Sequence, residues 1–251
     1  MKNTIKRTLV LNKLFLSLCS QALEQDKVRK YLLEVRKCSE EIIKKFDLRF
    51  KDFESVFLDS LDVSEYEFAK EIGLITLDEE TNELRDKFQN CIVFPYAVPC
   101  FGPIAFGFRK LHEKIYINSS RSPVFTKDWS FYGLAQAIPE ILKTDWIIIV
   151  EGYFDVLRMH QLGITNTIGV AGTGVSEYRT SAMRRLANNF LLLFDSDEAG
   201  EKAKNRTKKQ LKNLGVHVVA LELPNEEKQD PDSFGLKYPE KLKSKIYEIM
   251  K

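Results

Sequence analysis

The stretch WIIIVEGYFD, residues 146–155, decides the fold class of this chain. A run of large apolar residues without alternation is typical of a strand that is buried on both faces of a sheet. A glutamate and a glycine follow directly, and the spacing of apolar residues then predicts a helix at about 153–162. A strand that passes through a short turn into a helix begins a βαβ unit, so the sequence predicts a parallel sheet.

The C-terminal half repeats this alternation of strands and helices. Further strands are predicted at residues 167–171, 190–194 and 216–221. Strands that alternate with helices at spacings of roughly 20 to 25 residues favour parallel pairing through βαβ units. Besides the helix at 153–162, helices are expected at about 130–143, 176–188, 198–214 and 239–250.

The N-terminal half has a different pattern. Residues 1–86 are expected to be mainly helical, with amphipathic spacing at 28–46 and 66–75. From Cys91 onward, short β-favouring runs alternate with proline and glycine, which predicts an antiparallel or mixed sheet. These runs lie at residues 92–94, 104–106 and 115–117.

These patterns together predict an α/β protein. Its parallel sheet is flanked by helices and is preceded by a mixed α+β N-terminal subdomain. The expected domains are residues 1–143 for this subdomain, 144–225 for the parallel sheet, and 226–251 for a further acidic segment with the last helix.

Bulk properties exclude few functions. The chain has 251 residues, 44% hydrophobic and 29% charged, with a formal net charge of +2, so total charge does not predict nucleic-acid binding. The longest apolar runs, residues 146–150 and 191–194, are far too short to cross a bilayer. Residues 1–18 resemble a signal peptide superficially, but Lys13 interrupts the apolar stretch. We therefore expect an amphipathic helix there and a cytoplasmic protein that does not bind a membrane.

The cysteines do not form a metal-binding pattern. No C-x-x-C pair exists, and the histidines are not near the cysteines in sequence, so we expect no zinc. Buried, reduced thiols are expected instead. The cysteines are Cys19, Cys38, Cys91 and Cys100.

Carboxylates follow three of the predicted strands. Glu151 comes directly after the first strand, Asp195 and Asp197 follow the third, and Asp230 and Asp232 lie in the loop after the fourth. The carboxyl ends of parallel strands share one edge of a sheet, where binding crevices form. In an extended segment, the Asp-x-Asp spacing also lets alternate side chains point the same way. The sequence therefore predicts an acidic site at this edge.

Such a cluster of anions suits divalent cations. Unpaired carboxylates repel one another, and Mg²⁺ prefers oxygen ligands combined with substrate phosphates. This chemistry is typical of phosphoryl transfer. An alternative reading is structural, because acids after strands also cap helices, as Asp197 and Asp155 could do.

The same residues resemble a known family. Residues 151–157, EGYFDVL, resemble the glutamate motif of the Toprim domain in bacterial DnaG-type primases. Residues 194–200, FDSDEAG, resemble the aspartate motif, and residues 230–232, DPD, the third acidic motif. Between them, Gly172-Thr173 matches the Gly-Thr of the family. The order and spacing agree over about residues 30–240, which is far more specific than a lone Asp-x-Asp.

Upstream segments separate the primases from other Toprim proteins. The family-like segments lie at residues 94–95, 106–109, 116–119 and 132–134. The resemblance implies a Toprim-type parallel sheet and a site that binds Mg²⁺ or Mn²⁺. Its principal, catalytic ligands would be Glu151, Asp195 and Asp197, with Asp155, Asp230 and Asp232 completing the acidic site. Glu151 is alternatively a general base toward the attacking 3′-hydroxyl.

The resemblance also implies contacts to nucleotide or template. Lys127 would contact nucleotide phosphate or template, and Arg109 would line the same groove, since arginine suits bidentate phosphate contacts. The other expected binding residues are Tyr116, Asn118, Arg36 and Thr173.

The chain departs from the family pattern in several places. The zinc ribbon and the helicase-binding domain of the family are not recognisable, and residues 86–91 carry fewer basic residues than the family does. Gly107-Phe108 replaces a Gly-Gly pair before Arg109. These departures suggest a minimal primase core. It would either come from a mobile element, a phage or a reduced genome, or work with a separately encoded helicase or zinc-ribbon partner.

The leading hypothesis is synthesis of RNA primers from ribonucleoside triphosphates on a single-stranded DNA template during DNA replication. One alternative is a Toprim-type nuclease that uses the same metal site. A second alternative is a DNA-binding or regulatory module that has weak catalytic activity and needs a partner.

Overall fold

The structure is a computed structural model that describes residues 2–52, 54–127, 130–172, 175–224 and 229–251. The chain divides into two compact units. Unit 1 comprises Met1–Arg36 and Ile43–Lys127, and unit 2 comprises Lys37–Ile42 and Asp128–Lys251. The polypeptide therefore enters unit 2 briefly at residue 37 before it completes unit 1. The domain boundaries expected after residues 143 and 225 stay a prediction.

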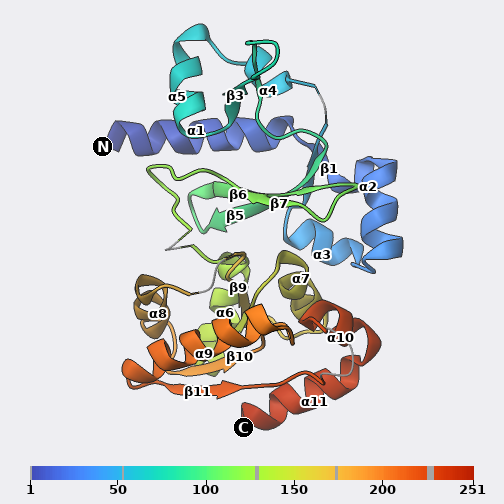
Figure 1. Ribbon diagram of the computed structural model, residues 1–251, viewed down its shortest axis with the longest axis vertical. Coiled ribbons are helices and arrows are strands. Elements are labelled where there is room, and N and C mark those ends of the chain that lie inside the picture. The colour runs from blue at the N-terminus through green and yellow to red at the C-terminus, as the bar shows by residue number, and fades with distance from the viewer. Residues whose placement is uncertain (1, 53, 128–129, 173–174, 225–228) are drawn as a thin grey trace. The chain divides into compact units, whose positions relative to one another are not determined.

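Unit 2 contains the parallel sheet predicted from the sequence (Figure 1). Its strands are β8 (Trp146–Val150), β9 (Thr167–Gly169), β10 (Asn189–Leu192) and β11 (His217–Ala220). They lie in the order β11-β10-β8-β9, and each neighbouring pair is parallel. The predicted fold class is thus confirmed.

This strand order places a reversal of the chain's direction across the sheet between β8 and β10. From β8 the chain crosses to β9 on one side, and it then returns to β10 on the other side of β8. Ligands of open α/β sheets bind at such a reversal, outside the carboxyl ends of the strands. Glu151 follows β8 and Asp195 follows β10, so both lie at this point.

Helices cover the sheet, and β8 is therefore buried along its whole length. One core contains Ile147 and Ile149 of β8 together with Ala137, Met183 and Leu211 from three helices. The helices of unit 2 are α6 (Leu134–Thr144), α7 (Tyr153–Gln161), α8 (Glu177–Arg184), α9 (Glu198–Asn213), α10 (Pro231–Lys237) and α11 (Pro239–Ile249).

Helix α10 was not predicted. The sequence placed Asp230 and Asp232 in an extended loop, and this expectation is wrong. Asp230 is the N-cap of α10, and its carboxylate accepts a hydrogen bond from Ser233 N at 2.6 Å. Pro231 occupies the first turn, where its missing N–H costs nothing. The two aspartates therefore begin a helix.

Unit 1 is built on an antiparallel sheet in the order β1-β2-β5-β6-β7. Its central hairpin is formed by β5 (Cys91–Val98) and β6 (Gly102–Lys110). Helix α1 (Lys2–Leu18), which was predicted, packs against β6. The ring of Phe15 on α1 lies 5.0 Å from that of Phe106, and both side chains are fully buried.

The N-terminal region is less helical than predicted. Short strands were missed, because two- or three-residue segments show no alternation and form only by pairing with another strand. The remaining strands are β1 (Ser20–Gln21), β2 (Arg49–Lys51), β3 (Ile75–Leu77), β4 (Leu84–Asp86) and β7 (Tyr116–Asn118). The remaining helices are α2 (Asp26–Lys30), the π-helical turn Tyr31–Val35, α3 (Glu40–Lys45), α4 (Val56–Asp59) and α5 (Tyr66–Glu71), with 3₁₀ turns at Ala22–Glu24 and Val63–Glu65.

The hairpin also runs through prolines that the sequence placed between strands. Pro95 lies inside β5 and Pro103 inside β6. Strand β2 pairs with β5 only as far as Val93, so Pro95 lies beyond the neighbour to which it would have to donate a hydrogen bond. The two strands are consequently longer than their β-favouring runs.

The cysteines are free thiols, as predicted, but one of them is not buried. Cys19, Cys38 and Cys91 are buried, whereas Cys100 is exposed in the turn between β5 and β6. Burial raises the pKa of the Cys19 thiol to about 12 and that of Cys91 to about 11.

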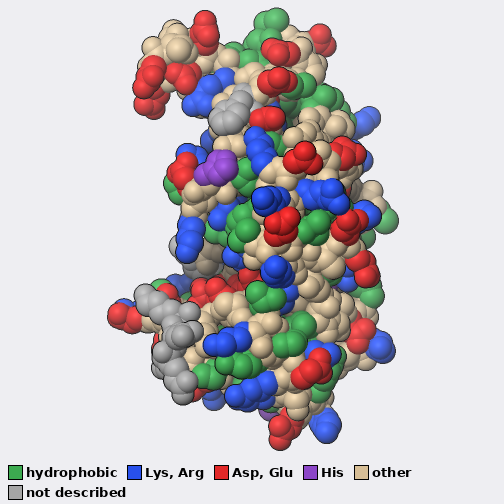
Figure 2. All heavy atoms as spheres, turned by 90° about the vertical axis from the view of Figure 1, so that its right-hand side faces the viewer, with side chains coloured by type: hydrophobic (Ala, Val, Ile, Leu, Met, Phe, Trp, Pro, Cys, Tyr) green, Lys and Arg blue, Asp and Glu red, His purple; other side chains and the backbone are tan. Residues whose placement is uncertain are grey.

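The surface carries both signs of charge. Figure 2 shows acidic and basic side chains interspersed over the face that it presents, in keeping with the formal net charge of +2. Within the described part of the chain, no helix is long and apolar enough to span a bilayer.

Candidate active site

Glu151 links two strands at the sheet edge. Its Oε1 accepts a hydrogen bond from Asp195 N at 3.0 Å, which ties the end of β8 to the segment after β10. Burial raises the pKa of the Glu151 carboxyl, and the nearby charge of Asp197 adds to this effect, while the Asp195 N–H opposes it. The glutamate is therefore oriented by the backbone of the second acidic motif.

Asp195 and Asp197 behave differently although they are two residues apart. Asp197 is the N-cap of α9, and its Oδ1 accepts a hydrogen bond from Gly200 N at 2.9 Å. Asp195 is half-buried, and burial together with the charges of Asp155 and Glu151 raises its pKa to about 8. Its Oδ1 is buried without a hydrogen-bond partner in the described part of the chain. Asp195 thus has a free carboxylate oxygen that would be stabilised by a cation.

Gly200 permits this close arrangement. A Cβ atom at this position would overlap with the backbone oxygen of Asp195 and would lie 2.7 Å from Glu151 Oε1. Gly200 is part of the aspartate motif, but no role was predicted for it. The sequence did carry a signal for this role. Glycine destabilises the first turn of a helix, so its presence there indicates that another part of the chain packs closely against it.

Asp155 is the most buried of the acidic residues in this group, with 5% of its surface exposed. Its Oδ2 accepts a hydrogen bond from Gly152 N at 2.7 Å, and its Oδ1 accepts one from Asp232 N at 3.0 Å. Burial raises its pKa to about 7, and the charge of Asp230 adds to this effect. Asp155 therefore connects the start of α7 with the start of α10.

The third acidic motif is joined to the second through Ser196. Ser196 N donates to Gln229 O at 3.0 Å, and Gln229 N donates to Ser196 Oγ at 2.9 Å. Asp230 follows directly and caps α10. Ser196 occupies the variable middle position of Asp-x-Asp, where the sequence offered no signal for this role.

Asp232 already forms an ion pair with an arginine side chain. Its Oδ1 accepts a hydrogen bond from Arg158 Nε at 2.9 Å, and the side chains are 11% and 3% exposed respectively. Arg158, which lies in α7 between two acidic motifs, was not predicted as a site residue.

A cavity opens beside the second acidic motif. Its volume is about 430 Å³, within the range of small-molecule sites. Asp195 and Asp197 form part of its wall, together with residues that follow β11. As positioned among the described residues, no three carboxylate, thiol or imidazole side chains already form a metal site.

The predicted nucleic-acid residues that the structure describes lie in unit 1, and three of them are linked through Tyr31 and Arg109. Arg36 N donates to Tyr31 O at 2.9 Å. The Arg109 guanidinium lies 4.6 Å from the centre of the Tyr31 ring and 5.7 Å from that of Tyr116. Arg109 itself is 6% exposed, and its Nη1 donates to the backbone oxygens of Lys110 and Leu111. Among these residues, Tyr116 has the most exposed side chain, with 45% of its surface accessible.

The other predicted binding residues are more dispersed. Asn118 lies on β7, and its Oδ1 accepts a hydrogen bond from Tyr96 Oη at 3.3 Å. Lys127 is exposed at the end of unit 1. Thr173 lies outside the described residues; before it, Ala171 and Gly172 both have positive φ angles, 44° and 145°.

The fold and its acidic edge define the class of protein. A parallel sheet with a glutamate after one strand and Asp-x-Asp after its neighbour is the Toprim arrangement, and a family model described as Toprim-like matches residues 148–235. A second model, described as the N-terminal domain of the DNA primase catalytic core, matches residues 16–138. The chain belongs to the DnaG-type primase family and corresponds to its catalytic core portion.

Individual relatives agree with this assignment. A DNA primase of Staphylococcus aureus is 33% identical over 174 residues, which are 68% of this chain and 29% of that protein. A DNA primase domain from Pseudomonas aeruginosa is 33% identical and has a TM-score of 0.80, covering 91% of this chain and 75% of that one. A DnaG primase catalytic domain bound to single-stranded DNA shares the fold, with a TM-score of 0.87 at 23% identity, covering 99% of this chain and 80% of that one. This chain thus spans about a third of the length of its curated relatives.

Proposed function

We propose that this chain synthesises RNA primers from ribonucleoside triphosphates on a single-stranded DNA template during DNA replication, and that it acts in the cytoplasm. The observation that carries the proposal is the gathering of three acidic motifs in unit 2, where Asp195 N binds Glu151 and Asp232 N binds Asp155. Relatives named DNA primase and a related structure with bound single-stranded DNA support this assignment.

A divalent cation, Mg²⁺ or Mn²⁺, fits the donor set. Membership of the Toprim primases implies dependence on such a metal, and carboxylate oxygens are the ligands that these ions prefer. The buried Oδ1 of Asp195 lacks a hydrogen-bond partner in the described part of the chain, and the pKa of its carboxyl is raised to about 8, so a nearby positive charge would stabilise the carboxylate. The residues that would hold the ions are Glu151, Asp155, Asp195, Asp197 and Asp230, whereas Asp232 is paired with Arg158.

The reaction joins a 3′-hydroxyl to the α-phosphorus of an incoming nucleotide and releases pyrophosphate. The bound ions would supply electrostatic stabilisation of the phosphates. Glu151 is held at the edge of β8, where it can serve as a ligand or accept the hydroxyl proton. Asp197 fixes the start of α9, whose N-terminal dipole favours phosphate groups.

Unit 1 would contribute contacts to template and nucleotide. The ring of Tyr116 is exposed and supported by Arg109, which suits stacking on a base. We assign contacts to template or nucleotide to Arg36, Arg109, Tyr116, Asn118, Lys127 and Thr173. The action of a helicase or a zinc-ribbon module together with this chain is a prediction.

A primer-synthesis assay tests this function. Wild type, Glu151→Gln and Glu240→Gln are incubated with mixed single-stranded DNA templates, labelled ribonucleotides and Mg²⁺ or Mn²⁺. Glu240 is the matched control, because its side chain is 81% exposed on α11. We expect short RNA products from wild type and the control, and a loss of about 100-fold or more in Glu151→Gln.

Other outcomes would overturn the proposal. Metal-dependent cleavage of DNA without RNA synthesis would identify a nuclease that uses the same carboxylates. Neither activity, even with a helicase and a zinc-ribbon protein added, would indicate a DNA-binding or regulatory module. RNA synthesis that survives Glu151→Gln would place the active centre elsewhere.

A further inference from the structure

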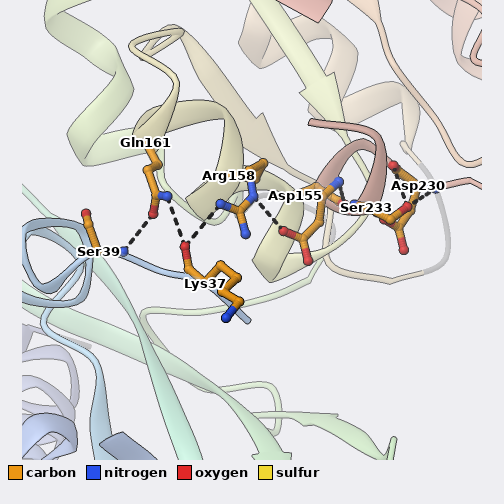
Figure 3. A network of polar contacts seen from close by, with 8 residues as sticks. Lys37, Ser39, Asp155, Arg158, Gln161, Asp230 and Ser233 are labelled. Carbon is orange, nitrogen blue, oxygen red and sulfur yellow. Dashed lines mark hydrogen bonds and ion pairs between the residues drawn. The ribbon is translucent and has the colours of Figure 1, made fainter. Parts of the chain in front are cut away.

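The Arg158 guanidinium joins two segments that are distant in sequence. Its Nε donates to Asp232 Oδ1 at 2.9 Å, and its Nη1 donates to the backbone oxygen of Lys37 at 3.2 Å. The Arg158 side chain is 3% exposed, so this charge is almost fully removed from water. Figure 3 shows Arg158 and Gln161, both on α7, pointing toward the backbone of Lys37. Both segments belong to unit 2.

The contacts at Lys37 form a small bonded network. Lys37 has a φ angle of 52°, and its carbonyl oxygen accepts a second hydrogen bond from Gln161 Nε2 at 3.0 Å. Gln161 Oε1 in turn accepts one from Ser39 N at 2.7 Å. Arg158 is therefore held at one end by a fixed segment of backbone, which limits the positions that its Nε can adopt.

At the other end, the ion pair ties the first turn of α10 to α7. Gly235 of α10 packs so closely that a Cβ atom there would lie 2.9 Å from Arg158 Cγ. With α10 in this place, Asp232 N donates to Asp155 Oδ1. Asp155 is one of the proposed metal ligands. Its position therefore depends on Arg158 through the pairing of Arg158 with Asp232.

We infer that Arg158 is a positioning residue for the carboxylate site, and that Asp232 is its buried counter-ion and not a metal ligand. This inference rests on the proposed function. If Asp232 Oδ1 coordinated a cation, it would have to give up the Arg158 pair and leave a buried guanidinium without its partner, which is strongly unfavourable. Residues that orient metal ligands typically change metal affinity by about 10- to 100-fold when replaced.

The two roles of Asp232 predict opposite results for Mn²⁺ binding. Mn²⁺ is titrated into DNA-free and nucleotide-free protein, and the free ion is followed by electron paramagnetic resonance. We expect Arg158→Met to raise the Kd by about 10-fold or more, because the Asp232 carboxylate is then buried without a partner and the start of α10, which bonds Asp155, is displaced. Asp232→Asn should change the Kd by less than about threefold, since an amide oxygen can still accept the hydrogen bond from Arg158 Nε. The double variant Arg158→Met, Asp232→Asn should recover most of the affinity, because no charge is left unpaired.

Arg85→Met is the matched control. Arg85 also pairs with an aspartate, Asp78, at 2.7 Å, but the pair lies in unit 1 and is more exposed. We expect this variant to bind Mn²⁺ like wild type. If Arg158→Met does not fold, Asp232→Asn and the double variant decide the question.

The inference is overturned if Asp232→Asn weakens Mn²⁺ binding as much as Asp195→Asn does. It is equally overturned if Arg158→Met folds and binds Mn²⁺ as tightly as wild type, or if the double variant loses the affinity that Asp232→Asn retains. Failure of wild type itself to bind Mn²⁺ would instead remove the metal site of the proposed function, and this is seen before any variant is compared.

Discussion

Asp195 is a residue whose charge is disfavoured by its surroundings. Burial and four neighbouring carboxylates, those of Asp155, Glu151, Asp230 and Asp197, all raise the pKa of Asp195, which reaches about 8. When a carboxyl has a higher pKa in the folded than in the unfolded protein, the free energy of unfolding falls as pH rises above the pKa of the unfolded state. The ionised Asp195 therefore lowers the stability of the metal-free protein, and the same carboxylate is suited to bind a cation.

Replacing Asp195 by asparagine should stabilise the metal-free protein. The amide has nearly the same shape and no charge, so Asp195→Asn should gain on the order of 1 kcal/mol at pH 8, after allowance for partial exposure. This corresponds to a rise in Tm of about 2–4 °C. The gain should shrink as pH falls toward 4, where the native Asp195 is already protonated.

Thermal unfolding in EDTA at pH 8 and pH 5 measures this effect. Asp62→Asn, at an exposed position of unit 1, is the control and should not change Tm. A variant that is less stable than wild type at pH 8, or equally stabilised at both pH values, would contradict the explanation.

Gly200 gives a second prediction at the residue scale. Alanine is usually better than glycine in a helix by about 1 kcal/mol, but here its Cβ would overlap with Asp195 O. We expect Gly200→Ala to destabilise the protein by about 1–3 kcal/mol, because the overlap is with backbone that cannot move freely. Urea unfolding measures the loss, with Lys209→Ala on the exposed face of α9 as the control. An unchanged or increased stability would show that the loop after β10 can yield.

At the scale of elements, an ion pair in unit 1 holds β4, β2 and α4 together. Asp86 of β4 is fully buried, and its carboxylate accepts hydrogen bonds from Phe57 N at 3.1 Å and Leu58 N at 2.8 Å, at the start of α4. Lys51 Nζ of β2 lies 3.1 Å from the same carboxylate. In sequence, Asp86 belonged to a stretch noted only for having few arginines; in the structure it connects three elements.

Asp86→Ala should therefore destabilise unit 1 strongly. It leaves Lys51 buried without its counter-ion and removes the acceptor for two N–H groups at the start of α4, which costs about 3–5 kcal/mol. Hydrogen exchange should lose protection in β2, β4 and α4, with the β8–β10 pairing of unit 2 protected as in wild type. Asp59→Ala, at an exposed position of α4, should leave exchange unchanged. Equal loss in both units would show that the chain unfolds as one cooperative body.

The elements were predictable to different degrees for a physical reason. Strands such as β8 and helices such as α9 are long enough for their periodicity to be visible locally. Helix α10 was missed because its seven residues, Pro231–Lys237, contain few apolar positions. It is stabilised by the Asp230 cap and by contact with α7.

At the scale of the whole molecule, the acidic site should make stability depend on pH and metal together. The pKa values of Glu151, Asp155 and Asp195 are all raised, to about 7 for Asp155 and about 8 for Asp195. The folded protein therefore binds more protons than the unfolded chain between about pH 4 and 8, and its stability falls as pH rises through this window. The pKa values of Asp78 and Glu201 are lowered instead, so these two groups oppose the trend only toward the acidic end of this window.

We expect the Tm in EDTA to fall steadily between pH 5 and pH 8.5. Saturating Mn²⁺ should reverse the fall, since a ligand at 100 times its Kd adds about 2.7 kcal/mol. Differential scanning calorimetry with and without Mn²⁺ measures both effects, and Asp195→Asn should lose most of the Mn²⁺ response. A Tm in EDTA that rises with pH across this window would contradict the assignment of the raised pKa values.

The sequence by itself determined the parallel sheet of unit 2 and the edge at which its acids lie. Apolar runs specify strands locally, βαβ connections have one hand, and residues that follow strands must then lie at the same edge. Glu151 and Asp195 could be placed there because each follows its strand within three residues. The upstream primase-like segments were likewise visible as ordered motifs.

Only the tertiary structure decided how these acids are held. Arg158 meets Asp232 across 74 residues, and Ser196 meets Gln229 across 33. Such pairs leave no periodic signal in the sequence, because they depend on which helices pack together and on which charges must be compensated once water is excluded. The carboxylates were therefore predictable as a group, whereas the distinction between a carboxylate open to a cation and one already paired with arginine came from packing alone.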